Sequence, residues 1–200
     1  MSVLNILFVG SDEVARSIAK KSDSRDVDNY IYKDLKEGGL FSTISILRPN
    51  NYPDKPKPFF TSLTVSDFGI IEINKVDGVF GEVIVSMASA GIKKGLVILN
   101  ASEGEWVDDS QVKALLQQAG LSNWEFIEND GILIREKLIE VLNQIKPNED
   151  EGFVVAVDQA FTVKGVGLVA IGHVQSGKVN KHDELILAGS EGNAIARSLQ

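Results

Sequence analysis

The residues most able to do chemistry lie at the end of the first hydrophobic run, in Gly10–Ser17 (GSDEVARS). A glycine between a buried strand and a helix marks the place where an α/β fold binds phosphate, because backbone N–H groups and the helix dipole converge there. The spacing matches the phosphate-loop pattern GxxxxGK(S/T), with Gly10 and Ser17 at its ends. Ala15 replaces the second glycine of that pattern and Arg16 replaces its lysine. Ser17 keeps the hydroxyl that would bind Mg²⁺.

The same turn has two features that weaken a phosphate site. Asp12 and Glu13 place two negative charges where a polyphosphate would lie, and like charges repel. The dinucleotide-binding pattern GxGxxG is absent, which counts against a Rossmann site. An ordinary strand-to-helix turn without a ligand therefore stays open as an interpretation of this segment.

The elements that must position this turn follow an alternating pattern. From Val3 to Ile145, short hydrophobic runs alternate with segments of helical period, which predicts βαβ units around a mostly parallel sheet. The expected strands are Val3–Val9, Ser42–Leu47, Phe68–Ile73, Gly95–Leu99 and Trp124–Ile127. The expected helices are Asp12–Lys21 with Asp12 as its cap, Gly81–Gly91, a helix from Asp108 or Asp109 to Gln118, and Gly131–Ile145. Prolines 49, 53, 56 and 58 predict a loop that leads into a short helix.

The pattern changes after Gly152, where the helical period ends. Short strands are expected at Phe153–Val157, Gly167–Gly172, Lys178–Val179 and Glu184–Leu187. Turn residues separate them, as is typical of antiparallel β structure. The predicted domains are an α/β domain over 1–147, an acidic linker over 148–152, and part of a β-barrel over 153–200.

Composition limits the function classes. The 200 residues include no cysteine, which excludes disulfides and thiolate metal sites and favours an intracellular location. The net charge of −8 argues against broad binding to a phosphate backbone, although a small basic patch could still contact RNA. No signal peptide and no run long enough to cross a bilayer is visible, so we expect a cytoplasmic protein without membrane or DNA partners.

The second half carries a resemblance to a known family. The segment 153–187 (FVVAVDQAFTVKGVGLVAIGHVQSGKVNKHDELIL) closely resembles domain two of elongation factor Tu, elongation factor one alpha and SelB. Phe161 would face the barrel interior, Gly165 and Gly167 would form a tight turn, and Gly177 and Asp183 would close hairpins. The final residues 196–200 (ARSLQ) resemble the VRSIQ strand of that domain.

With that anchor, residues 1–147 resemble the GTPase domain of the same family in element order, closest to divergent archaeal SelB-like factors. The guanine-binding motif NKxD becomes Asn100–Glu103 (NASE), in which Asn100 could still bind the base and Glu103 keeps a carboxylate. The γ-phosphate motif DxxG becomes Arg48–Asn51 (RPNN), and Tyr52 replaces the histidine that usually follows. Hydrolysis needs these parts together, so we expect it to be lost, with no catalytic residue.

The resemblance implies a translation elongation factor-like pseudo-GTPase that acts through tRNA or ribosome contact. GTP and GDP binding is expected to be weak or lost, and Mg²⁺ is expected only if GTP binds, with Ser17 as its one ligand. The residues that would contact the nucleotide are Gly10, Ala15, Arg16, Ser17, Asn100 and Glu103. Family members continue past this length, so further domains are expected outside this chain. Three alternatives stay open: an active GTP-binding factor in which Arg16 replaces the lysine, an interaction scaffold unrelated to translation, and a metabolic enzyme.

Overall fold

A computed structural model describes residues 2–35, 41–100, 107–144, 152–189 and 192–199 of the chain. The chain divides into two compact units, Met1–Ile145 and Lys146–Gln200, each of which is described by itself. Of the predicted linker 148–152, only Gly152 lies within the described residues.

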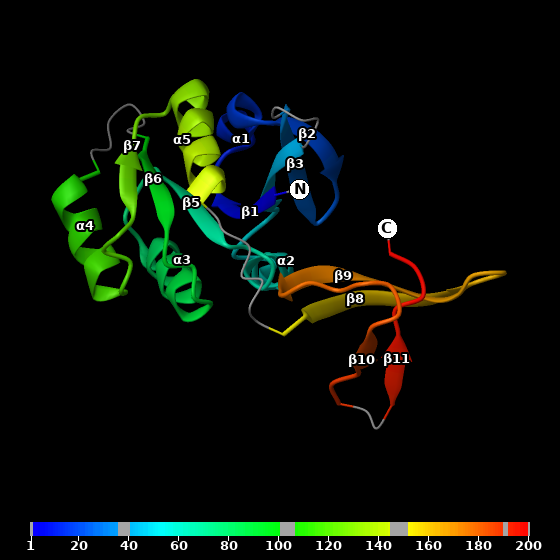
Figure 1. The fold of residues 1–200 in the computed structure, drawn as a ribbon. Helices are drawn as coiled ribbons and strands as arrows, with labels where there is room; N and C mark the ends of the chain where they lie inside the picture. The colour runs from blue at the N-terminus through cyan, green and yellow to red at the C-terminus, as the bar shows by residue number, and fades with distance from the viewer. Residues whose placement is uncertain (1, 36–40, 101–106, 145–151, 190–191, 200) are drawn as a thin grey trace. The chain divides into compact units, whose positions relative to one another are not determined.

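The first unit is built on a seven-stranded sheet with the order β2-β3-β4-β1-β5-β6-β7 (Figure 1). Its strands are β1 (Ser2–Val9), β2 (Lys20–Ser24), β3 (Val27–Leu35), β4 (Phe41–Pro49), β5 (Phe68–Ile73), β6 (Gly95–Leu99) and β7 (Glu125–Ile127). Strands β4, β1, β5, β6 and β7 are parallel, and β3 is antiparallel to both of its neighbours. The predicted α/β fold with a mostly parallel sheet is confirmed.

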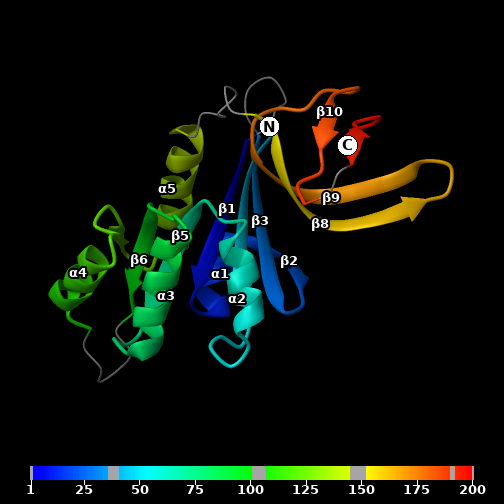
Figure 2. The same ribbon diagram turned by 90° about the horizontal axis from the view of Figure 1, so that it is seen from below.

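Five helices cover the two faces of this sheet in the described part of the unit: α1 (Asp12–Ile18), α2 (Pro56–Leu63), α3 (Gly78–Ser89), α4 (Asp109–Gln118) and α5 (Gly131–Gln144). Side chains of α1 and α5 share one hydrophobic cluster with the sheet, and those of α2, α3 and α4 share another. Figure 2 shows α2 and α3 in front of the sheet. Because strand residues alternate between faces, Ile70 belongs to the first cluster and Ile71 to the second.

Helix α5 buries the face that its sequence pattern indicates, and Trp124 lies in the hydrophobic core. Ile134, Leu138 and Leu142 are all buried, as their spacing along one helix face predicts. Trp124 is 5% exposed and packs in the second cluster. Trp106, the other tryptophan, lies outside the described residues.

The β2–β3 hairpin is the main difference from the prediction. The helix expected through Lys21 ends at Ile18, because Ala19 has extended backbone angles and Lys20 begins β2. Ser11, not Asp12, caps the helix: its side chain accepts the Val14 N–H. β2 (KKSDS) has no hydrophobic alternation because it is an exposed edge strand, so its residues carry no strand pattern that sequence analysis could detect.

The second unit contains two antiparallel hairpins. β8 (Val154–Val163) pairs with β9 (Gly167–Ser176), and β10 (Glu184–Ile186) pairs with β11 (Asn193–Ile195). Gly165 and Gly167 have φ values of 87° and 104°, which the predicted tight turn requires. The strand predicted at Lys178–Val179 is wrong, because neither residue lies in a strand.

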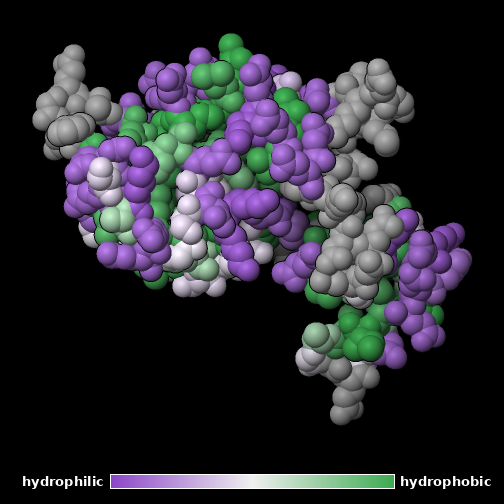
Figure 3. Space-filling view, turned by 60° about the vertical axis from the view of Figure 1, so that its left-hand side comes forward, coloured by the Kyte–Doolittle hydropathy of each residue, from purple (hydrophilic) through white to green (hydrophobic). Residues whose placement is uncertain are grey.

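Hydrophobic side chains of the second unit lie at its surface (Figure 3). Phe161, expected to face a barrel interior, is 42% exposed, and Leu168 is 75% exposed. Ala196 is the only buried hydrophobic residue among the described residues of this unit. These strands therefore have no covering layer within the described residues of their own unit. Among the described residues, no helix combines the length and hydrophobicity that a membrane span requires.

Candidate functional site

The candidate site lies where the order of the parallel strands reverses. β1 has β4 on one side and β5 on the other, and open α/β sheets bind ligands at the carboxyl ends of the strands beside such a point. A hollow of about 380 Å³ lies there. Its lining comes from the turn after β1, the ends of β5 and β6, and the start of α5: Ser11, Glu13, Val14, Ser17, Glu72, Asn100, Asn129 and Gly131.

A buried carboxylate of the protein itself occupies the phosphate-loop turn. Glu72, 7% exposed and near the end of β5, accepts the backbone N–H of Ser11 at 2.6 Å from its Oε2. Its Oε1 accepts the side-chain amide of Asn100 at 2.7 Å. Gly10 permits this approach, because a Cβ at that position would lie 2.6 Å from Glu72 Oε2.

Glu72 was not identified from the sequence, although one signal was present. It is the only charged residue in the strand FGIIEI, all six residues of which are buried. A carboxylate in that position requires partners, since an unpaired buried charge is costly. Those partners, Ser11 and Asn100, are 61 and 28 residues away in the chain.

The structure brings only some of the predicted nucleotide-contacting residues together. Ser17 and Asn100 line the hollow, and Gly10 adjoins it through its contact with Glu72. Ala15 is fully buried in the hydrophobic core. Arg16 is absent from the lining and pairs with Asp12, one turn earlier in α1. Glu103 lies outside the described residues.

The described residues are a poor fit for a magnesium polyphosphate. Glu13 and Glu72 line the hollow, and its described lining contains no lysine or arginine. The Ser17 hydroxyl donates to the Val14 carbonyl at 2.7 Å. No group of three His, Asp or Glu side chains that could hold a metal ion occurs among the described residues. A phosphate-binding turn relies on cations and free N–H groups. Here the described lining contains no cation, and the N–H groups of Ser11 and Val14 are already paired.

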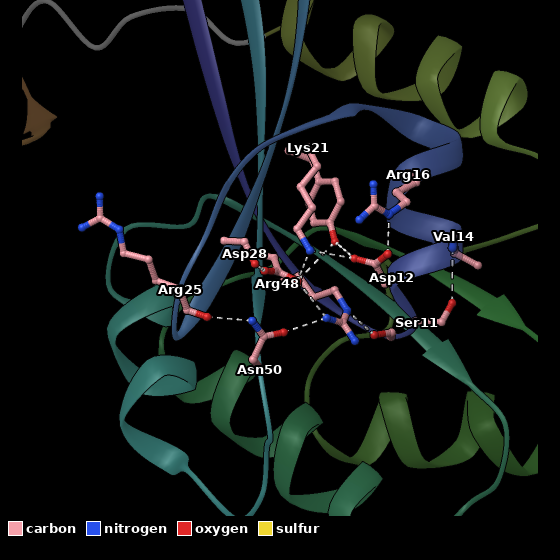
Figure 4. A network of polar contacts seen from close by, with 12 residues as sticks. Ser11, Asp12, Val14, Arg16, Lys21, Arg25, Asp28, Arg48 and Asn50 are labelled. Atoms are coloured by element: carbon pink, nitrogen blue, oxygen red, sulfur yellow. Dashed lines mark hydrogen bonds and ion pairs between the residues drawn. The ribbon is translucent and has the colours of Figure 1, made fainter.

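Arg48, at the position of the motif aspartate, takes part in a polar network beside the loop (Figure 4). Its Nε donates to the Gly10 carbonyl at 2.7 Å, and its Nη1 lies 3.2 Å from Asp28 Oδ2. Asp28, on β3, is 3% exposed and also pairs with Lys21 Nζ at 2.8 Å. Asp28, from the β2–β3 hairpin that the sequence did not predict, is thus the counterion of Arg48, whose side chain contacts Gly10.

Asp12 belongs to the same network and is fully paired. Tyr30, Arg16 and Lys21 all donate to its carboxylate, and these hydrogen bonds hold the pKa of Asp12 well below its usual range. Burial, together with the hydrogen bond to Asp12, raises the pKa of Tyr30 to about 12. The negative charge at position 12, expected to repel a ligand, is therefore balanced within the protein.

The lowered pKa of Asp12 predicts a pH-dependent contribution to stability. Asp12 stabilises the fold fully above its unfolded-state pKa of 3.8, and this contribution is lost as pH falls through the lower folded-state value. The free energy of unfolding of Asp12→Asn should therefore differ from wild type by a constant amount from pH 6 to 8. That difference should shrink at pH 3. Urea unfolding followed by circular dichroism at each pH measures it.

Asp54→Asn is the control for the substitution itself, because Asp54 is exposed and has no ion pair among the described residues. An Asp12→Asn difference that stays equal at pH 3 and pH 6 would show that the network does not depend on the ionised carboxylate.

Comparisons with known proteins show a relative in sequence and several solved structures with a similar fold. No protein-family model matches the chain. A protein of Methanocaldococcus jannaschii, the uncharacterised protein MJ0325, is 31% identical over 195 residues, which cover 97% of this chain and 59% of that protein.

Solved elongation factors share the fold across nearly the whole chain. A bacterial selenocysteine-specific elongation factor EF-Sec superposes with a TM-score of 0.67 over 97% of this chain and 38% of its own, at 18% identity. SelB of Methanococcus maripaludis, in complex with the GTP analogue GPPNHP, gives 0.64 over 99% of this chain and 47% of its own, at 18% identity. Its apo form gives 0.59 over 98% and 49%, at 17% identity.

At these identities the structural matches establish the fold alone. The chain resembles SelB and EF-Sec over its whole length, with a GTPase-like first unit followed by part of a domain-two-like β structure. It spans 59% of its relative from M. jannaschii and less than half of each solved elongation factor.

Proposed function

We propose that the chain is part of an elongation-factor-like protein of the SelB and elongation factor Tu type that acts in translation without binding GTP. One observation carries the proposal: the Glu72 carboxylate accepts the Ser11 N–H at the turn where a GTPase would hold phosphate. The protein then keeps the architecture of a GTPase and uses it to contact tRNA or the ribosome.

Electrostatics supports the loss of nucleotide binding. Two like charges 4 Å apart repel by about 4 kcal/mol at an effective dielectric constant near 20. A phosphate in this turn would meet the charges of both Glu72 and Glu13, with no cation in the described lining to offset them. Asn100, the residue that would bind guanine, already donates to Glu72.

The alternative of an active GTP-binding factor requires these partners to separate. Arg16 would have to leave Asp12 to reach a phosphate, and the Ser17 hydroxyl would have to leave the Val14 carbonyl to bind Mg²⁺. Arg48 would still stand where the metal-linked carboxylate is needed. We therefore propose that hydrolysis is lost.

Titration calorimetry tests the proposal. We expect no saturable heat with GDP, GTP or GPPNHP, with or without Mg²⁺, which corresponds to a dissociation constant weaker than about 1 mM. Glu72→Gln is the matched variant, because it removes the charge and keeps the side-chain length. Micromolar, Mg²⁺-dependent binding by the wild-type protein would favour the active GTP-binding factor instead.

The translational role has its own test. Co-sedimentation with ribosomes and a gel shift with tRNA should both detect association of the intact protein, including any domains beyond this chain. If the intact protein associates with neither, the scaffold unrelated to translation becomes the better interpretation.

A further inference from the structure

A second hollow on the first unit gathers positive charge. It lies among the end of α1, the β2–β3 hairpin and α5, and is lined by Arg16, Ile18, Ala19, Lys20, Lys21, Ile31, Tyr32, Lys33 and Arg135. Five of these nine side chains are cationic and none is acidic. In a chain with 20 lysines and arginines and a net charge of −8, this hollow, called the basic hollow below, is a marked local excess of positive charge.

Three of the five cations have no acidic partner in the part of the chain that the structure describes. Arg16 and Lys21 are paired with Asp12 and Asp28 in the network beside the loop. Lys20, Lys33 and Arg135 make no ion pair among the described residues. Their charge is therefore available to a ligand.

The hairpin register places the two free lysines near each other. Lys20 of β2 lies opposite Ile31 of β3, and Lys33 is two residues further along the same strand. Lys20 and Lys33 are therefore diagonal neighbours on one face of the hairpin, about 7–8 Å apart. Both are exposed.

Arg135, on α5, also lines the hollow and is held by its own contacts. Its Nε donates to the Ile18 carbonyl at 2.7 Å and its Nη2 to the Ser17 carbonyl at 2.9 Å. The guanidinium also lies 4.9 Å from the centre of the Tyr32 ring. Two of its five N–H groups are used in this way, and the other three have no hydrogen-bond partner among the described residues. A preorganised guanidinium suits phosphate oxygens, because its planar fork can bind two of them at once.

We propose that the basic hollow binds the phosphate backbone of RNA. Five cationic residues line one hollow, and three of them have no acidic partner among the described residues, so their charges can pair with phosphates. A membrane surface is a poorer partner, because the hydrophobic lining residues Ile18 and Ala19 are buried and cannot insert. The choice of RNA over an acidic protein rests on the proposed function in translation.

Fluorescence anisotropy with a labelled single-stranded RNA of 20 nucleotides tests the proposal. Neutralising three phosphates should give a log–log salt slope of about −2 between 50 and 200 mM KCl. The double substitution Lys20→Glu and Lys33→Glu should weaken binding at least about tenfold and make the slope shallower by about 1.4. Lys20→Gln with Lys33→Gln should give an intermediate loss.

Lys93→Glu with Lys94→Glu is the matched control, because it changes net charge by the same amount at two exposed lysines outside the basic hollow. We expect binding within about twofold of wild type for this control. Equal weakening by both double substitutions, or no RNA binding by wild type with native circular dichroism, would overturn the proposal. Equal competition by poly-glutamate would assign the surface to an acidic protein instead.

The outcome separates this inference from the proposed function. If ribosome association persists after Lys20→Glu and Lys33→Glu while RNA anisotropy is also unchanged, the basic hollow is not an RNA site and the translational role stands. If RNA binds at the basic hollow but the intact protein associates with neither ribosomes nor tRNA, the basic hollow is an RNA site and the proposed role in translation is wrong.

Discussion

Asp28→Asn is expected to lower the free energy of unfolding of the first unit by about 3 kcal/mol. Asp28 is 3% exposed and neutralises both Lys21 and Arg48, whose side chains are only 20% and 21% exposed. Removing the carboxylate leaves Arg48 without an ion pair among the described residues and leaves Lys21 with Asp12 as its one acidic partner there. Burial by itself raises the pKa of Asp28, but hydrogen bonds from Lys21 and Ser24 outweigh burial and lower it, so the group is ionised at neutral pH.

Urea unfolding at pH 7, followed by circular dichroism, measures this loss. Asp23→Asn on the neighbouring strand is the control, since Asp23 pairs with Arg25 at an exposed site where the side chains are 54% and 83% exposed. An exposed pair of this kind contributes less than about 1 kcal/mol. Equal effects of the two substitutions would show that the network beside the loop contributes no more than an ordinary surface ion pair.

Gly95→Ala and Gly81→Ala are expected to change stability in opposite directions. A Cβ on Gly95 in β6 would lie 2.6 Å from the Gly69 carbonyl oxygen of β5 and 2.6 Å from the Trp124 ring. The backbone of a central strand cannot move away easily, so we expect a loss of about 2 kcal/mol. A Cβ on Gly81 in α3 meets nothing within 4 Å. There alanine should stabilise by about 0.5–1 kcal/mol, because it loses less entropy on entering a helix.

Thermal unfolding of both variants tests the pair of predictions with one chemical change. A neutral Gly95→Ala would show that β5, β6 and Trp124 can separate to admit a methyl group. Destabilisation by Gly81→Ala would show that α3 is packed more tightly at that position than its open surroundings indicate.

The polar contacts around the loop after β1 oppose the binding of a magnesium nucleotide. Three of the groups that a magnesium nucleotide would use have internal partners: the Ser11 amide binds Glu72, the Ser17 hydroxyl binds Val14, and the Asn100 side chain binds Glu72. A ligand would have to displace these contacts and recover their free energy before it gained any affinity. Within the loop region, the Glu72 carboxylate is the acceptor for the Ser11 N–H and the Asn100 amide.

Much of the fold followed from the sequence because it depends on local pattern. Buried parallel strands appear as continuous hydrophobic runs, and Phe68–Ile73 and Gly95–Leu99 were predicted with the bounds that the structure has. The spacing in α5 predicted its buried face, and Asp108 was one of the two caps expected for α4. The glycines at 165 and 167 marked the turn between β8 and β9.

By itself, then, the sequence determined the α/β class, the position of the phosphate-loop turn and the departures from each GTPase motif, since these are properties of neighbouring residues. Only the tertiary structure decided what occupies that turn. The polar strand β2 has no periodic signal, and Arg48, Asp28 and Gly10 meet through strand pairing across the sheet. Glu72 reaches Ser11 because β5 lies beside β1, a contact between residues 61 positions apart. Charge pairing of this kind depends on which strands become neighbours, and no local pattern in the chain encodes that choice.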